Sequence, residues 1–132
     1  MVDFKELNDD DWHRRLTANE FKVCREKGTE PAFSGEYCDE KSAGTYVCNC
    51  CGQPLFHSKN KYDSGSGWPS FYQPLSSDVV AEIPDTSHGM VRVETVCANC
   101  GCHLGHVFTD GPEPTGLRYC TNSLSLQLQK EE

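Results

Sequence analysis

The feature that most constrains this chain is a short cysteine pattern that occurs twice. Residues 48–55 and 97–104 both read Cys-x-x-Cys-Gly-x-x-Leu. Each copy predicts a tight turn that carries two thiols, with a Gly where the backbone reverses and an apolar anchor after it. Four soft ligands from two such turns suit a closed, tetrahedral structural zinc site. The predicted ligands of this single Zn²⁺ ion are Cys48, Cys51, Cys97 and Cys100.

Alignment of the two copies decides which cysteines belong to the metal. Cys50 aligns with Asn99, and Cys102 aligns with Gln53, so neither is matched by a cysteine in the other copy. Four of the nine cysteines are therefore assigned to the metal. The other five are left for different roles.

Length and composition predict one domain, residues 1–132, that gains stability from a bound metal. The net charge of −8 argues against a nucleic-acid partner, because neutralising phosphates requires a basic face. We expect no membrane partner, since the amino end lacks the apolar run of a signal peptide and no segment is long enough to span a bilayer. The odd cysteine count favours a reducing, cytoplasmic location, or an organelle after removal of a targeting peptide.

Helix signals are confined to the amino-terminal part of the chain. Residues 8–11 place a cap and acidic side chains before Trp12, and Thr17 with Glu20 forms the pattern of a capping box. We expect one short helix after each signal, with Gly28 as the stop of the second.

Strand signals dominate the rest. Residues 44–47 lead into the first cysteine turn, and residues 89–96 alternate as a half-buried strand that enters the second. Residues 104–109 predict another strand, and residues 117–128 end in a strict alternation that predicts the last one. Residues 62–72 read as a loop. The expected fold is therefore mainly β and antiparallel, with a short helical N-terminal segment and the zinc site at one end.

Cys120 is the candidate reactive thiol. Arg118 and Asn122 lie two residues to either side, so on an extended chain all three project to the same face. A cation and a hydrogen-bond donor nearby stabilise a thiolate. The alternative is a buried, inert cysteine, which is the usual fate of a free thiol. The polar neighbours on the same face argue against that alternative.

His103 and His106 follow the second cysteine turn and are the candidate acid–base groups. Imidazoles close to a thiol supply the proton transfers that thiol chemistry requires. Asp110 is a candidate to orient one of them. Two alternatives stay open: histidines with a purely structural role, and a metal-binding His-x-x-His pair, although four cysteines already close the shell of the zinc.

Trp68 lies on the Ser- and Gly-rich loop. An exposed tryptophan on such a loop is unfavourable unless it packs or binds something. We therefore interpret Trp68 as an aromatic wall for a small apolar group of a substrate, with an ordinary core tryptophan as the alternative.

These motifs together resemble the B-type methionine sulfoxide reductases, the peptide-methionine (R)-S-oxide reductases. The resemblance runs from about Trp12 to Leu128 and its motifs are long. Besides the paired cysteine turns, the matching segments are GTEPAFSGEY (28–37), SGSGWPSFY (64–72), SHGMVRVE (87–94), HLGHVFTDGPEPTG (103–116) and RYCTNS (118–123).

The resemblance implies a fold of two antiparallel sheets that carries a structural zinc. It implies reduction of the R epimer of methionine sulfoxide to methionine, in oxidised proteins, peptides or small derivatives, and hence repair of oxidative damage. It also implies thioredoxin or another thiol as the reductant. We expect a monomer.

The resemblance also assigns roles to residues. The nucleophile falls on Cys120, the acid on His106 and its companion on His103. Attack by the Cys120 thiolate on the sulfoxide sulfur, with a proton supplied to the leaving oxygen, implies a sulfenic acid on that cysteine. Trp68 falls on the aromatic residue that holds the sulfoxide methyl. The other site positions of the family fall on Asp110, Asn122 and, for substrate binding, Arg118.

The sequence departs from the family where a second, resolving thiol is expected. Ser66 and Ser34 stand at the two positions where members carry that cysteine. We expect Cys38 or Cys24 to resolve the sulfenic acid, although acidic neighbours raise the pKa expected for Cys38. Direct attack by an external thiol is the alternative. The other two free cysteines flank predicted zinc ligands and are Cys50 and Cys102.

Two rival functions compete with the reductase. A zinc-bearing interaction module would share the fold without catalysis, but it would not need a reactive thiol beside two histidines. A zinc hydrolase would need an open coordination position, which a four-cysteine site does not leave.

Overall fold

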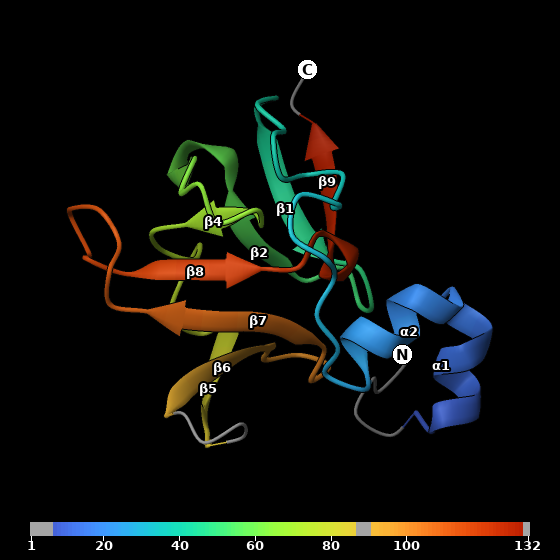
Figure 1. Cartoon of the computed structure of the whole chain (residues 1–132). Coiled ribbons are helices and arrows are strands. Elements are labelled where there is room, and N and C mark those ends of the chain that lie inside the picture. Colours follow the sequence, from blue (N-terminus) through green and yellow to red (C-terminus); the bar gives the residue numbers. More distant parts are fainter. Residues whose placement is uncertain (1–6, 87–90, 131–132) are drawn as a thin grey trace.

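The strands of the chain form two antiparallel sheets in the computed structural model, which describes residues 7–86 and 91–130 (Figure 1). The smaller sheet has the strand order β2-β1-β9, and the larger one has the order β3-β4-β8-β7-β6-β5. Two short helices lie beside them, so the expected mainly β fold is confirmed. The strands are β1 (Gly44–Cys48), β2 (Pro54–His57), β3 (Lys61–Tyr62), β4 (Ser70–Phe71), β5 (Val80–Asp85), β6 (Arg92–Cys97), β7 (His103–Phe108), β8 (Arg118–Thr121) and β9 (Leu126–Lys130).

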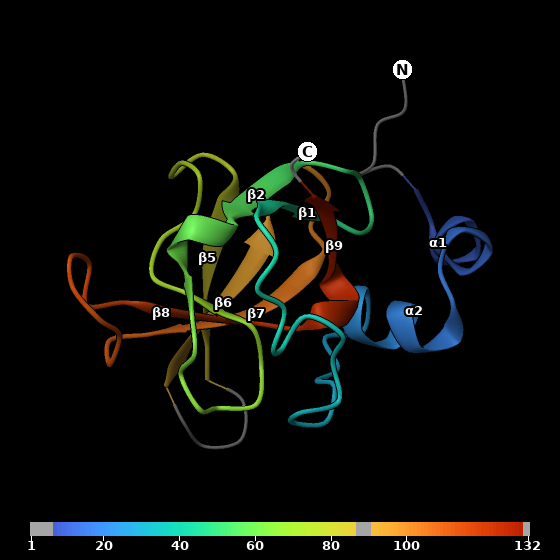
Figure 2. The same cartoon turned by 90° about the horizontal axis from the view of Figure 1, so that it is seen from above.

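Capping boxes begin both helices, whereas the sequence predicted a box only at the second and a simple cap at the first. Asn8 caps α1 (Asp9–Arg15) and Thr17 caps α2 (Ala18–Cys24), each in reciprocal hydrogen bonds with the residue three positions later. The second helix ends before the predicted stop at Gly28. Seen from above, the two helices lie at one end of the molecule (Figure 2). No helix within the described ranges is long and apolar enough to cross a membrane.

The expected last strand is divided in two. The prediction of one strand within residues 117–128 is wrong, because a 3-10 turn, η4 (Ser123–Ser125), separates β8 from β9. This turn carries the chain from the larger sheet to the smaller one. The buried Ser125 hydroxyl donates a 2.7 Å hydrogen bond to the carbonyl of His103, which ties the turn to the start of β7.

The strand that enters the second cysteine turn also differs from its prediction. β6 begins at Arg92, and residues 89 and 90 lie outside the described part of the chain. The alternation predicted an inward Val91 and an outward Glu94. Instead, Val91 is 88% exposed and Glu94 is 3% exposed. The hydrogen bond between Glu94 and His103 offsets the cost of burying this carboxylate.

Four strands had no clear sequence signal. β2 and β5 had no predicted counterpart. β3 and β4 have two residues each; β3 ends on the first residue of the expected loop at residues 62–72, and β4 lies within that loop. Their hydrogen-bonding partners lie on other segments of the chain. Ser70, for example, pairs with Cys120 of β8. Pairing over such sequence distances leaves no local pattern to read.

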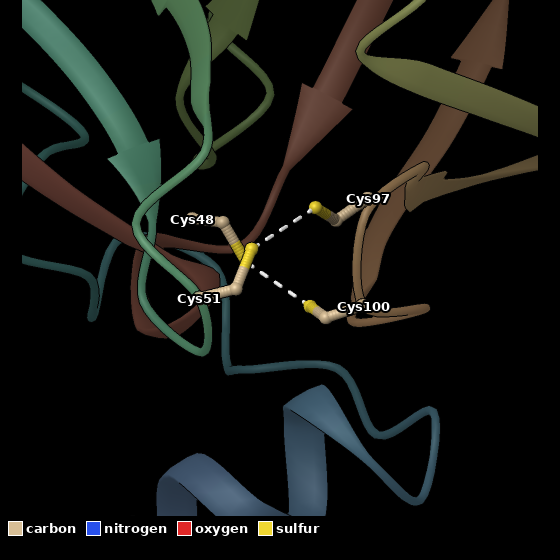
Figure 3. A group of neighbouring side chains, drawn as sticks. All are labelled: Cys48, Cys51, Cys97 and Cys100. Atoms are coloured by element: carbon tan, nitrogen blue, oxygen red, sulfur yellow. Dashed lines mark hydrogen bonds between the residues drawn. The ribbon is translucent and has the colours of Figure 1, made fainter. Parts of the chain in front are cut away.

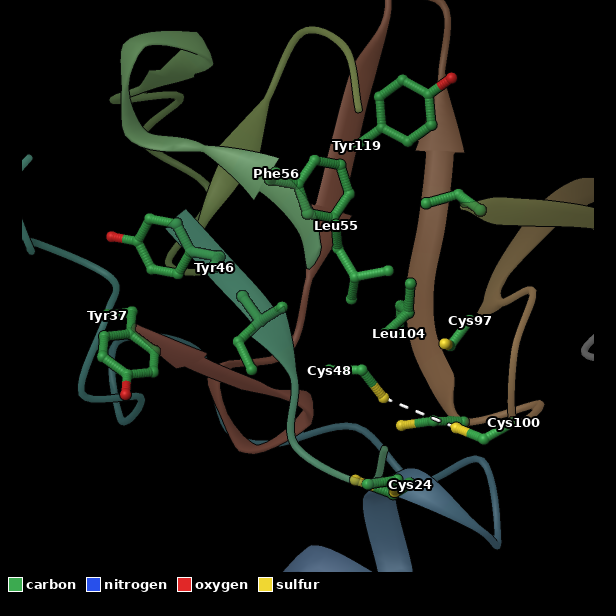
Figure 4. Packing of buried hydrophobic residues seen from close by; sticks show 14 of the residues in the cluster. Cys24, Tyr37, Tyr46, Cys48, Leu55, Phe56, Cys97, Cys100, Leu104 and Tyr119 are labelled. Carbon is green, nitrogen blue, oxygen red and sulfur yellow. Dashed lines mark hydrogen bonds between the residues drawn. The ribbon is translucent and has the colours of Figure 1, made fainter. Parts of the chain in front are cut away.

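Aromatic side chains from both sheets fill the space between them (Figure 4). Phe56 of the smaller sheet stacks on Phe71 of the larger one, with ring centroids 4.3 Å apart, and Tyr46 meets Phe71 edge to face at 5.2 Å. Tyr119 of β8 is also buried in this cluster. Because side chains alternate along a strand, the next residue, Cys120, projects to the opposite face of the sheet.

Gly105 allows β7 and β8 to approach closely at the level of that cysteine. A β-carbon added to Gly105 would come within 1.9 Å of the Cys120 carbonyl oxygen. Any side chain there would push the two strands apart. The close pairing sets His106 directly opposite Cys120 in the antiparallel register.

Candidate active site and four-cysteine metal site

The two cysteine turns meet and bring their four predicted thiols together (Figure 3). One pair follows β1 of the smaller sheet and the other follows β6 of the larger sheet. The Sγ atoms all lie within 4.8 Å of one another. Cys48 and Cys100 are 3.6 Å apart, as are Cys51 and Cys97. A compact group of four soft donors can hold a metal ion in a tetrahedral shell.

The two turns have the same backbone geometry, as the sequence repeat predicts. In the first, the Gly52 N–H donates to the Cys48 carbonyl at 2.8 Å, and in the second, the Gly101 N–H donates to the Cys97 carbonyl at 2.8 Å. Both glycines have positive φ angles, 82° and 79°. Such angles are unfavourable for other residues, so the glycines allow each turn to close around its thiols.

A separate cavity of about 110 Å³ lies on the larger sheet and contains the candidate catalytic residues. It brings together the predicted nucleophile, both histidines, the loop tryptophan and the predicted asparagine. The cavity is lined by Thr29, Trp68, Arg92, His103, Gly105, His106, Phe108, Cys120, Thr121 and Asn122.

Cys120 lies in this cavity between a cation and a hydroxyl. Burial raises the pKa of its thiol above the ordinary value, while the positive charge of Arg118 and a hydrogen bond from Ser66 act in the opposite direction. The predicted parity of Arg118 and Cys120 on β8 is reproduced by their burial pattern. Ser66, at one of the positions where the family carries a resolving cysteine, is therefore one of the groups that lower the pKa of the candidate nucleophile.

Both imidazoles in the cavity are held by carboxylates from neighbouring strands. The Nδ1 atom of His103 lies 2.7 Å from the Glu94 carboxylate, and the Nε2 atom of His106 lies 2.8 Å from the Asp85 carboxylate. Burial lowers the pKa of His103, and its bond to Glu94 partly opposes that shift. These bonds fix one nitrogen of each ring, and both rings line the cavity together with Cys120.

Sequence reasoning missed both carboxylates. Asp85 also forms an ion pair with Arg92 at 3.3 Å, and Glu94 forms one with Lys27 at 3.4 Å. For Glu94 a signal existed, since an acidic residue shares its strand face with the apolar Val96. Asp85 lies on a strand that had not been predicted, so nothing in the sequence directed it to a histidine.

Asp110 binds arginine in this structure. Its carboxylate accepts bonds of 2.9 and 3.2 Å from the Arg118 guanidinium, whereas the sequence analysis expected it to orient an imidazole. The arginine lowers the pKa of Asp110, and Asp110 raises the pKa of Arg118. Asp110 thus holds the cation whose charge lowers the pKa of Cys120.

Asn122 is buried, and its amide fixes the loop that forms one wall of the cavity. Its Oδ1 atom accepts a 3.0 Å bond from the Glu30 N–H, and its Nδ2 atom donates a 3.0 Å bond to the Leu104 carbonyl. The Glu30 carbonyl in turn accepts a 2.9 Å bond from the Trp68 indole N–H. Asn122 therefore holds Trp68 in place through one intervening residue.

The two expected resolving cysteines lie elsewhere. Cys24 is buried at the end of α2, near the four-cysteine group (Figure 4). Cys38 is half-buried in a different depression, beside Lys61, and burial together with the charge of Asp39 raises the pKa of its thiol. Neither is among the residues that line the cavity.

Comparison with known proteins matches residues 16–130 to the SelR domain. The chain is similar to the peptide methionine sulfoxide reductase MsrB of Saccharophagus degradans, at 67% identity over 99% of this chain and 98% of the relative. It is also similar to the MsrB proteins of Teredinibacter turnerae (59% identity, 100% and 98% coverage) and Acinetobacter baylyi (60% identity, 92% and 88% coverage).

These matches extend over nearly the whole chain and over nearly the whole of each relative. They confirm the expectation of an oxidoreductase that acts on a sulfur group. With its two antiparallel sheets and its paired cysteine turns, the chain belongs to the SelR-domain family of B-type methionine sulfoxide reductases.

Proposed function

We propose that this chain reduces the R epimer of methionine sulfoxide to methionine, in oxidised proteins and in small derivatives, and so repairs oxidative damage. The observation that carries the proposal is the convergence of Cys120, His103, His106 and Trp68 on one small cavity. A thiol, acid–base groups and an aromatic wall are the chemical parts that the reduction requires.

Cys120 is the proposed nucleophile, and its thiolate attacks the electrophilic sulfur of the sulfoxide. The S–O bond of the substrate breaks, and the oxygen ends on the Cys120 sulfur as a sulfenic acid. The sulfoxide gains two electrons and leaves as methionine, while the cysteine loses two. The oxygen takes up a proton during this transfer, because an unprotonated oxygen leaves poorly.

His106 is the proposed proton donor, with His103 as its companion. The two ring centroids are 5.8 Å apart, and both rings line the cavity beside Cys120. The carboxylates of Asp85 and Glu94 hold the rings in orientation, which shortens the search for a productive geometry.

Trp68 is proposed to hold the methyl group of the substrate. Its indole is half-buried and is fixed by the bond to Glu30, so one ring face can meet a small apolar group without further ordering. Arg118 does not line the cavity, but it shares a face of β8 with Cys120, and we propose that it contacts polar parts of the substrate. Asn122 positions this wall and does not itself need to touch the reacting atoms.

For regeneration, we propose that thioredoxin or another external thiol attacks the Cys120 sulfenic acid directly. That attack forms a disulfide and releases water, and a second thiol of the reductant then restores Cys120. The support is the serine, Ser66, at a position where the family carries a resolving cysteine, together with the placement of Cys38 and Cys24 outside the cavity lining.

We propose that the four-cysteine group binds one structural zinc ion. Cys48, Cys97 and Cys100 are buried and Cys51 is half-buried, so four thiolates close the shell without an open position for catalysis. The zinc holds the two turns together and takes no part in the proton transfers.

The charge around Cys120 should set its reactivity. Because Arg118 stabilises the thiolate, Arg118→Gln should raise the pH midpoint of Cys120 alkylation by roughly half to one unit. Asp110→Asn removes the counter-charge of Arg118 and should lower that midpoint. The rate of iodoacetamide modification of the Cys120 peptide, followed by mass spectrometry against pH, measures both. Shifts in the same direction for the two variants would contradict this assignment.

Turnover tests the proposed reaction. With dithiothreitol and a racemic methionine sulfoxide derivative, half of the racemate, the R form, should be consumed. Cys120→Ser should abolish turnover, and His106→Gln should lower kcat by about 100-fold or more. His13→Gln, a substitution in α1 far along the chain from the cavity residues, is the matched control and should keep the rate. No product, or product from Cys120→Ser, would refute the mechanism and leave an interaction module as the better interpretation.

A thiol count tests regeneration. After oxidation by one equivalent of substrate without reductant, one free thiol should be lost and dimedone should trap a sulfenic acid on Cys120. Loss of two thiols would instead reveal an internal disulfide. Peptide mapping would then identify Cys38, Cys24 or another cysteine as its partner.

Metal analysis tests the zinc site. One zinc per chain is expected by elemental analysis, and its removal by a chelator should abolish the cooperative thermal transition. Cys97→Ser should lower the free energy of unfolding by at least about 3 kcal/mol, because structural zinc contributes directly to folding. Cys38→Ser is the matched control and should retain both zinc and stability. A fully stable, zinc-free Cys97→Ser protein would contradict a structural role.

A further inference from the structure

Besides Cys38, three cysteines belong neither to the four-cysteine group nor to the cavity. The thiols of these three lie together. Cys24, Cys50 and Cys102 come from three separate segments, and their Sγ atoms all lie within 4.8 Å of one another. They are 1%, 8% and 0% exposed. One comes from the end of α2, one from inside the first cysteine turn, and one from just after the second turn.

We propose that Cys24, Cys50 and Cys102 form a second metal site, which binds a monovalent thiophilic ion, Cu(I), through three sulfur atoms. Soft thiolate ligands select ions of this class. The two cysteines that the internal repeat excludes from the zinc shell are thereby both used, and α2 supplies the third ligand.

The number of donors distinguishes this site from a second zinc site. Structural zinc is almost always four-coordinate. The nearest oxygen donors on the side of Cys24 are the Leu124 carbonyl, 3.5 Å from its Sγ atom, and the Ser125 hydroxyl at 3.9 Å. That hydroxyl already donates to the His103 carbonyl at 2.7 Å. On the side of Cys102, the His103 carbonyl lies 3.6 Å from the Sγ atom. These oxygens are hard donors, so the three sulfurs are the soft ligands of the group, and three soft ligands suit Cu(I), which accepts a trigonal shell.

A cation lies next to both cysteine groups. Arg25 follows Cys24 directly, and its guanidinium donates a 3.2 Å bond to the Cys100 carbonyl while it stacks over Trp12 at 4.3 Å. A Cu(I) ion with three thiolates is anionic, and the zinc thiolates add negative charge nearby. The fixed guanidinium offsets part of that charge, and the thiol protons that the metal displaces pass to solvent.

The main alternative is that these cysteines are three small buried side chains that pack under the zinc turns. A second alternative is that copper enters the four-cysteine group, whose Cys51 directly follows Cys50, and expels zinc from it. These possibilities give different metal contents, which makes the site testable without any assay of reductase activity.

The test uses the full chain, reduced and loaded with one zinc, under anaerobic conditions. Acetonitrile-stabilised Cu(I) is added in competition with a chromophoric Cu(I) chelator. The expected result is one copper retained per chain with the zinc still bound, and a copper absorption-edge spectrum that fits three sulfur ligands. Release of one zinc per copper bound, a shell of two or four sulfurs, or no retained copper would each overturn the proposal.

Variants locate the ion. Cys24→Ala and Cys102→Ala should each weaken Cu(I) binding by at least about 100-fold. Loss of a residue that only hydrogen-bonds to a metal ligand already weakens metal binding by about 10- to 100-fold. Cys38→Ala, a half-buried cysteine outside the group, is the matched control and should bind copper as the unaltered chain does. Unchanged affinity in Cys24→Ala would refute the site. If that variant loses its fold, the sulfur count and zinc retention of the unaltered chain still decide.

Discussion

The meeting of four sulfur atoms at the ends of two strands is the constraint on which the rest of the structure depends. β1 belongs to the smaller sheet and β6 to the larger one, so the cysteine turns join the two sheets at one point. β7 begins directly after the second turn and carries both cavity histidines. A metal held at this point would therefore fix the start of the strand that presents the acid–base groups.

Much of this arrangement could be predicted from local sequence. The paired turns, the two helix starts and the shared face of Arg118 and Cys120 each depend on residues close together in the chain. The contacts of Glu94 and Asp85 with the two histidines could not be predicted, because strand pairing across the sheet brings these residues together. The division of the last strand at Asn122 could not be predicted for a related reason. Hydrogen bonds from distant residues override the regular alternation of apolar and polar residues.

The cavity also shows how a polar side chain can matter without touching a substrate. Both ends of the Asn122 amide form hydrogen bonds with backbone groups. Through the backbone of Glu30, Asn122 also fixes the position of the Trp68 indole. The sequence suggested a direct role, because parity on the strand placed Asn122 beside Cys120. The alternation of side chains along a strand predicts the face on which a residue lies. It does not predict which group the side chain binds on that face. Asp110, which binds Arg118, makes the same point.

The size of the cavity has a further consequence for how the protein works. At about 110 Å³ it is well below the roughly 300 Å³ at which sites for drug-sized ligands begin, so it accommodates one small group at a time. Cys120 takes part in both halves of the proposed cycle, yet no second thiol lines the cavity among the described residues. In the proposed cycle, the product side chain must therefore leave before a reductant can reach the oxidised sulfur. A single small cavity thus imposes an order of events, in which the substrate and the reductant occupy it one after the other.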